Sequence, residues 1–283
     1  MNKSYSCVYS AQADIADTKI ISVETDISNG LHSFSVIGLA DRAVDEARDR
    51  VGAAIKNSEL TSPKTQNQKI TISLAPADIK KEGPSFDLSI AISYLLASGQ
   101  ISFDPKGIIF LGELSLSGNI KSVHGVLPIA LNARELGIHT LYVPKENARE
   151  AALASGISVY GVGSLKELLQ HLNLLVSPNR RISILPEQKV LLSQKKLSDL
   201  TDLSEVKGQT AAKRALLIAA SGGHNIALYG PPGTGKTMLA RALQGILPEL
   251  EEVEAFEVAS IHSIAGTLGN NITSTPPFRS PHH

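Results

Sequence analysis

The chain has 283 residues, 27 basic and 27 acidic side chains, 42% hydrophobic residues and one cysteine, Cys7. This length suffices for two domains with ordinary cores, while the zero net charge excludes a global basic field of the kind that attracts nucleic acid or anionic membranes. A lone cysteine excludes an internal disulfide, and because the chain has neither a signal-peptide pattern nor an apolar run of 18 residues, we expect a cytoplasmic protein.

Strand and helix patterns alternate over residues 1–175. Polar and apolar residues alternate over 21–27, and a helical pattern that Asp41 can cap continues to Ile55. The mixed-sign segment 42–50 is typical of a solvated helix face, and Gly118-Asn119 predicts a hairpin turn. We therefore expect a mixed α/β domain with hairpins and crossover helices. Its other expected elements are strands at 70–74, 107–114, 141–143 and 159–160, and helices at 86–97, 126–136, 145–154 and 164–172.

A polar linker over 176–202 separates this domain from a second one, which begins at residue 203. A helix that Gly222-Gly223 terminates opens the second domain. The apolar run 225–229 then predicts a buried strand, and 238–243 predicts a helix. The expected inward face of the first of these helices consists of Ala212, Ala215, Leu216 and Ala219.

Between that strand and helix lies a complete G-x-x-x-x-G-K-[ST] motif. Its glycines allow backbone N–H groups to surround a triphosphate at the positive end of the following helix. Lys236 would reach the β- and γ-phosphates, and the Thr237 hydroxyl would hold Mg²⁺, so these two residues carry the chemistry. We expect the binding site for a nucleoside triphosphate to consist of Gly230, Pro231, Pro232, Gly233, Thr234, Gly235, Lys236, Thr237 and Met238.

Several motifs together resemble a known family. In the second domain, 204–209, 222–225, 230–237, 261–266 and 277–283 are similar to segments of AAA+ ATPases related to magnesium chelatase. In the first domain, 26–31, 34–39, 74–78, 81–88 and 112–115 resemble the competence-associated (ComM-like, YifB-like) branch of these proteins.

This resemblance implies an α/β protein with an N-terminal domain that has the fold of the Lon protease domain, followed by a P-loop AAA+ domain over 203–283. It implies ATP and Mg²⁺ as cofactors and a hexameric ring of copies of the chain. It further implies a motor that drives branch migration of DNA during recombination, with branched or single-stranded DNA as partner. The segment Glu205–Gln209 would contact the adenine, with Val206 as a wall for the base.

Two other candidate sites are less favourable. Gly83-Pro84-Ser85 looks like the nucleophile segment of Lon proteases, but the position matched to the catalytic lysine holds Ala133. Without a base to take its proton, Ser85 is expected to be inert and to cap the helix over 86–97. His262, His282 and His283 lack the further ligands at suitable spacing that a metal site needs.

Hydrolysis by a P-loop ATPase also needs an apolar strand that ends in Asp-Glu, and no such run occurs between Thr237 and His283. We therefore expect an incomplete AAA+ domain that binds ATP without turning it over, and an ATPase in the complete protein. Two alternatives to the DNA motor remain open: a chelatase-type subunit that remodels a partner for metal insertion, and a nucleotide-sensing module that recruits partners.

Overall fold

The computed structural model describes residues 4–14, 17–39, 41–65, 67–172, 182–188, 192, 201–269 and 271–280, except for the side chains of residues 42–45. The chain divides into two compact units. The first comprises Met1–Lys189 with Ser263–Thr267, and the second comprises Val190–His262 with Leu268–His283. None of the helices in the described ranges is long and apolar enough to cross a membrane.

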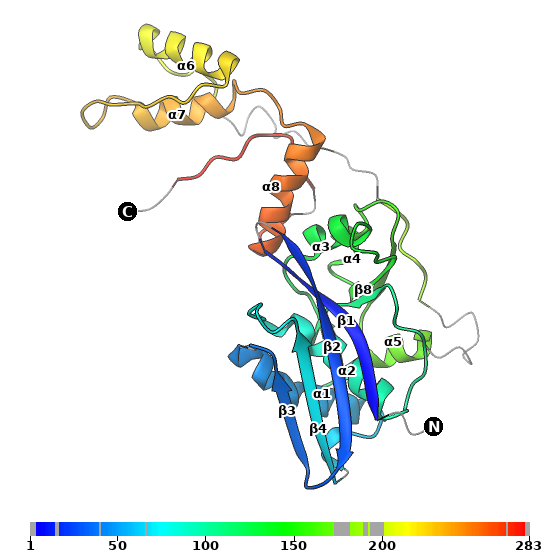
Figure 1. The fold of residues 1–283 in the computed structure, drawn as a ribbon. Coiled ribbons are helices and arrows are strands. Elements are labelled where there is room, and N and C mark those ends of the chain that lie inside the picture. The colour runs from blue at the N-terminus through cyan, green and yellow to red at the C-terminus, as the bar shows by residue number, and fades with distance from the viewer. Residues whose placement is uncertain are drawn as a thin grey trace. The chain divides into compact units, whose positions relative to one another are not determined.

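The first unit is built around a seven-stranded mixed sheet, in the order β3-β4-β2-β1-β5-β8-β9. Figure 1 shows β3, β4, β2 and β1 side by side. Strand β2 pairs antiparallel with β1 and β4, whereas β3–β4, β1–β5, β5–β8 and β8–β9 are parallel pairs. The expected combination of hairpins and crossovers is therefore confirmed. The strands are β1 (Tyr5–Ala13), β2 (Thr18–Asn29), β3 (Ser33–Ile37), β4 (Gln68–Ala75), β5 (Ile108–Phe110), β8 (Thr140–Pro144) and β9 (Ser158–Val162).

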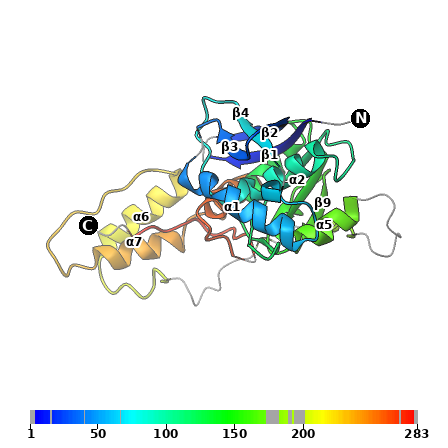
Figure 2. The same ribbon diagram turned by 90° about the horizontal axis from the view of Figure 1, so that it is seen from below.

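Helices cover this sheet and enclose two apolar cores. α1 (Arg42–Asn57), α2 (Asp87–Ala97) and α5 (Leu165–Leu172) share one core and lie on the same side of the strands (Figure 2). α3 (Val126–Ala133) and α4 (Ala148–Ala151) contribute to the other core. Every residue of α2 is buried, and eight of its eleven residues are apolar. Its two serines are satisfied internally: Ser89 donates to the Phe86 carbonyl, and Ser93 bonds to the Val23 carbonyl and the Thr25 hydroxyl.

The expected single strand over 107–114 is interrupted. Gly112 has φ 156°, its N–H donates to the Ser85 carbonyl, and its own carbonyl accepts from Leu88 N–H. Because these bonds direct the backbone away from the β5 ladder, the chain continues as β6 (Glu113–Leu114). β6 pairs with β7 (Ile120–Lys121) around the predicted hairpin turn.

Two predicted helices are shorter than expected. α3 ends at Ala133 rather than at residue 136, because residues 134–137 form a turn in which Gly137 adopts φ 75°. α4 spans only Ala148–Ala151 of the expected 145–154. Short 3₁₀ helices, η1 (Pro63–Thr65) and η2 (Pro84–Phe86), precede β4 and α2.

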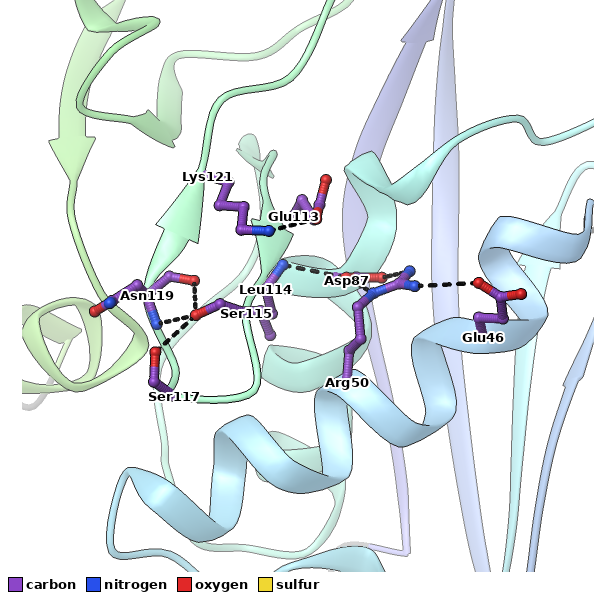
Figure 3. Close-up of polar contacts among 9 residues, drawn as sticks. All are labelled: Glu46, Arg50, Asp87, Glu113, Leu114, Ser115, Ser117, Asn119 and Lys121. Atoms are coloured by element: carbon purple, nitrogen blue, oxygen red, sulfur yellow. Dashed lines mark hydrogen bonds and ion pairs between the residues drawn. The ribbon is translucent and has the colours of Figure 1, made fainter.

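One buried ion pair joins α1, α2 and β6 (Figure 3). Arg50 Nε and Nη2 donate to the two oxygens of Asp87 at 2.7 and 3.0 Å, and Leu114 N–H donates to Asp87 Oδ2 at 3.1 Å. Asp87 is fully buried, and this burial raises the pKa of its carboxyl against the opposing effect of Arg50. The expectation of a solvated helix face is therefore wrong for Arg50, although Glu46, one turn earlier, also forms a local ion pair with it.

Lys81 is a second charged residue inside the first unit. Its side chain is fully buried, its Nζ donates to the Pro76 carbonyl, and burial lowers the pKa of its ammonium. A basic group whose folded-state pKa is lowered binds fewer protons in the native state than in the unfolded state. Stability therefore increases with pH between the lowered value and the ordinary lysine value of 10.5.

We expect the stability of the wild-type chain, measured relative to Lys81→Met, to rise as the pH increases from about 7 toward about 10. Denaturant unfolding of both proteins at several pH values measures this difference in unfolding free energy. The contributions of the titrating groups that both proteins share cancel in it. A difference that stays constant with pH would contradict a lowered pKa for Lys81.

The second unit contains α6 (Thr210–Gly222), α7 (Lys236–Gln244) and most of α8 (Glu252–Ile264). α6 and α7 enclose a small core of Val206, Leu216, Leu239 and Ala242. As predicted, α6 ends at Gly222-Gly223, where Gly223 takes a left-handed conformation and donates to the Ala219 carbonyl. Of the expected inward face of α6, Leu216 and Ala219 are buried and Ala212 is half-buried, but Ala215 is exposed.

Candidate nucleotide-binding site

The segment Asn225–Tyr229 leads into the glycine-rich loop, but it forms no strand. Ile226 and Leu228 pack against the core of the second unit, whereas Tyr229 is fully exposed. The prediction of a buried strand is wrong here, because no strand in the described part of this unit pairs with the segment or covers its other face.

The backbone of the loop depends on its glycines. Gly230, Gly233 and Gly235 adopt φ values of 155°, 79° and 84°. The latter two lie in the left-handed region that residues with a side chain rarely enter. α7 begins at Lys236, two residues earlier than predicted, so Lys236, Thr237 and Met238 occupy its first turn. No side chain caps this helix end, which leaves its first N–H groups available at the positive end of the helix dipole.

Lys236 lies back over the loop. Its Nζ donates to the Gly230 carbonyl at 2.8 Å and to the Pro231 carbonyl at 2.7 Å. Pro231 O also accepts from the Thr234 hydroxyl at 2.9 Å. The Lys236 ammonium therefore lies close to the backbone amides of the loop. A phosphate that binds this ammonium would have to replace the carbonyl groups of Gly230 and Pro231 as its acceptors.

The remaining residues of the motif are accessible. Pro231, Pro232, Gly233, Thr234, Gly235, Thr237 and Met238 are exposed, and Gly230 and Lys236 are half-buried. An exposed hydroxyl at Thr237, one residue after the lysine, has the chemistry of a Mg²⁺ ligand. The donor set therefore fits the phosphates of a nucleotide and their metal ion.

Upstream of α6, the structure changes the expected role of Val206. Its side chain is only 4% exposed and packs against Leu239 and Ala242 of α7. It supports the helix that follows the loop instead of offering a free wall to a base. Gln209 of the same segment contacts the loop directly, since its Nε2 donates to the Thr234 carbonyl at 3.3 Å. The sequence places this residue only in the expected base-contacting segment, and no pattern in it identifies the amide as a partner of the loop.

Ser85 is not the helix cap that its position suggested. It lies within η2, where Gly83 is the N-cap residue, and Phe86 takes that place for α2, with no side-chain cap on either. Ser85 lines a cavity of about 390 Å³ in the first unit, together with residues that include Gln12, Glu113 and His124.

Ala133, the position matched to a catalytic lysine, is the last residue of α3, where it is buried in the core, and it does not line this cavity. The match at Ala133 is therefore uninformative about a serine–lysine pair. None of the described residues that line the cavity is a lysine, the residue that would take the Ser85 proton in a serine–lysine pair.

The structure describes one of the three histidines that were considered as metal ligands. His262 is exposed near the end of α8, and His282 and His283 fall outside the described residues. Within the described ranges, no group of three or more His, Cys, Asp or Glu side chains is placed to hold a metal ion.

Comparison with known proteins connects both parts of the chain to one family. Residues 23–147 match the family described as "Subunit ChlI of Mg-chelatase", and residues 202–283 match "Magnesium chelatase, subunit ChlI". Competence protein ComM of Haemophilus influenzae is 42% identical over 282 residues, which cover 99% of this chain and 54% of ComM. YifB of Escherichia coli is 40% identical over 288 residues, covering 99% of this chain and 53% of YifB.

Two shorter matches are also found. A Lon protease from Aster yellows witches'-broom phytoplasma is 37% identical over 79 residues, covering 28% of this chain and 10% of that protein. DNA repair protein RadA of Streptococcus pneumoniae is 30% identical over 105 residues, covering 37% of this chain and 24% of that protein. The chain spans about half the length of ComM and YifB.

Proposed function

Because this chain belongs to the magnesium-chelatase-like protein family that includes ComM and YifB, we propose that it binds ATP with Mg²⁺ through residues 230–238. The observation that carries this proposal is the position of Lys236, whose ammonium lies over a glycine-rich loop at the uncapped start of α7. The positive ammonium group, the backbone N–H donors and the helix dipole all attract the same triphosphate group.

Each part of the site has one task in this proposal. Backbone N–H groups between Gly230 and Gly235 surround the phosphates, Lys236 neutralises the β- and γ-phosphates, and Thr237 holds the Mg²⁺ ion. When bound, Mg²⁺ would supply positive charge that neutralises the phosphate oxygens. The residues up to His283 supply no Asp-Glu pair at the end of a strand. Glu249 and Glu251 lie in the loop before α8, and Glu252 begins that helix.

We therefore expect magnesium-dependent ATP binding by the 283-residue chain with phosphate release no faster than that of a Lys236→Ala control. Titration calorimetry with and without Mg²⁺ measures the first quantity, and a phosphate-release assay measures the second. Absence of ATP binding to a folded chain contradicts the site. Turnover above the control contradicts the expectation that this chain binds ATP without hydrolysing it.

The wider proposal concerns the whole protein. We propose a cytoplasmic, hexameric AAA+ motor that acts on branched or single-stranded DNA in recombination. Residues 1–175 would form a non-proteolytic domain with the Lon protease-domain fold, joined by the linker 176–202 to residues 203–283. The names of the relatives support this direction, since ComM is a competence protein and RadA a DNA repair protein. The partial match to a Lon protease supports the fold of the first domain.

A chelatase-type subunit is the second candidate, because both family descriptions refer to magnesium chelatase. Such a subunit would use ATP to remodel a partner during metal insertion into a tetrapyrrole. For the full-length protein, ATPase stimulation by forked or four-way DNA supports the DNA motor, whereas porphyrin-dependent binding of a partner supports the chelatase role.

A further inference from the structure

Gln209 connects the segment before α6 to the phosphate loop. Its Nε2 donates to the Thr234 carbonyl at 3.3 Å. Thr234 lies between Gly233 and Gly235, which have φ values of 79° and 84°. The carbonyl that Gln209 holds therefore belongs to the peptide group between Thr234 and Gly235, immediately before Lys236.

The backbone of Gln209 makes this contact unusual. With φ 53° and ψ 38°, it has the left-handed conformation that favours glycine, and Gly208 before it has φ 66°. Glycine at position 209 would adopt this conformation more easily, but it could not reach the loop. Strained backbone of this kind persists where the surroundings hold it, and it is found preferentially at functional sites.

The segment that carries Gln209 is itself held firmly. Val206, three residues earlier, is buried against Leu239 and Ala242 of α7. The amide group thus extends from a segment packed on the same helix that the loop leads into. It can hold the loop in place relative to α7.

We propose that Gln209 is a positioning residue for the phosphate loop. A trans peptide group is planar, and its C=O and N–H point in opposite directions. Because Gln209 holds the Thr234 carbonyl on its own side of this peptide plane, the N–H of Gly235 points to the opposite side, where our proposal places the phosphates. This inference rests on the proposed ATP site and deepens it: Gln209 acts on the triphosphate chain, independently of the base.

The test compares ATP, GTP and inorganic tripolyphosphate as ligands, each with Mg²⁺. We expect Gln209→Ala and Gln209→Gly to weaken all three by a similar factor of about three to ten, the effect of one hydrogen bond. Gln209→Gly relieves the backbone strain, so its thermal stability should equal or exceed that of the wild-type chain while its affinity falls. Ser221→Ala removes an exposed hydrogen bond from α6 and should leave all three affinities unchanged.

Three outcomes would overturn the inference. If both Gln209 variants bind as tightly as the wild type, the amide does not position the loop. If ATP binding weakens while tripolyphosphate binding does not, Gln209 contacts the base. If the wild-type chain binds none of the ligands, or Lys236→Ala binds ATP as tightly as the wild type, the proposed function itself fails, and the inference fails with it.

Discussion

Replacing Asp87 with alanine is expected to lower the free energy of unfolding by about 3–5 kcal/mol. The carboxylate is fully buried and accepts bonds from Arg50 and from Leu114 N–H, so the substitution removes the buried anion to which a largely buried guanidinium donates two hydrogen bonds. It also removes the acceptor of the Leu114 N–H, and with it the polar contact that joins α1, α2 and β6. Denaturant unfolding followed by circular dichroism measures the loss.

Two further variants separate the ion pair from its surroundings. Lys166 and Glu59 form an ion pair of the same length, 2.7 Å, but on the surface, so Lys166→Met should cost less than about 1 kcal/mol. The double variant Arg50→Met/Asp87→Leu removes both charges and should be more stable than Asp87→Ala, because no buried charge remains unpaired. Equal losses for Asp87→Ala and Lys166→Met would contradict the role given to burial.

Replacing Lys236 with alanine should weaken ATP binding by about 30-fold or more, since losing one partner of a close charge pair typically costs about 2–5 kcal/mol. Among the described residues, the acceptors of this ammonium are the carbonyls of Gly230 and Pro231 in the loop. Its loss should therefore change thermal stability little. Titration calorimetry and a thermal melt on the same sample distinguish lost binding from lost folding.

The matched control is Arg241→Ala, which removes a positive charge from the exposed face of the same helix. We expect its ATP affinity to stay within about twofold of the wild type, because solvent and salt screen an exposed charge for which the described residues show no bond to the loop. If both substitutions weaken binding equally, the site responds to overall charge and not to a specific contact of Lys236.

Local patterns predicted most of the first unit. The alternation over 21–27 and the apolar face that includes Val51 and Ile55 report which side of an element is buried, and the structure confirms both. The interruption of 107–114 was not predictable in this way. It depends on bonds from Gly112 to Ser85 and Leu88, which are distant in sequence.

Contacts between distant segments account for the other differences. Arg50 lies in a mixed-sign stretch like those of many solvated helices, and only the fold brings Asp87, 37 residues later, beside it. The loop motif at 230–237 could be recognised from residue spacing. Its glycines are required by the local backbone conformation and do not depend on contacts with distant segments. The hydrogen bond from Gln209 to Thr234 joins residues 25 positions apart, and no rule of residue spacing predicts it.

The exposed ring of Tyr229 has a practical consequence. The chain has no tryptophan and six tyrosines, of which only Tyr229 belongs to the second unit, directly before Gly230. Fluorinated tyrosine incorporated throughout would therefore give one ¹⁹F resonance from this unit, and its solvent-accessible ring would set it apart from buried rings such as Tyr94 and Tyr142. Nucleotide addition could then be followed from that signal, with no label attached to the loop.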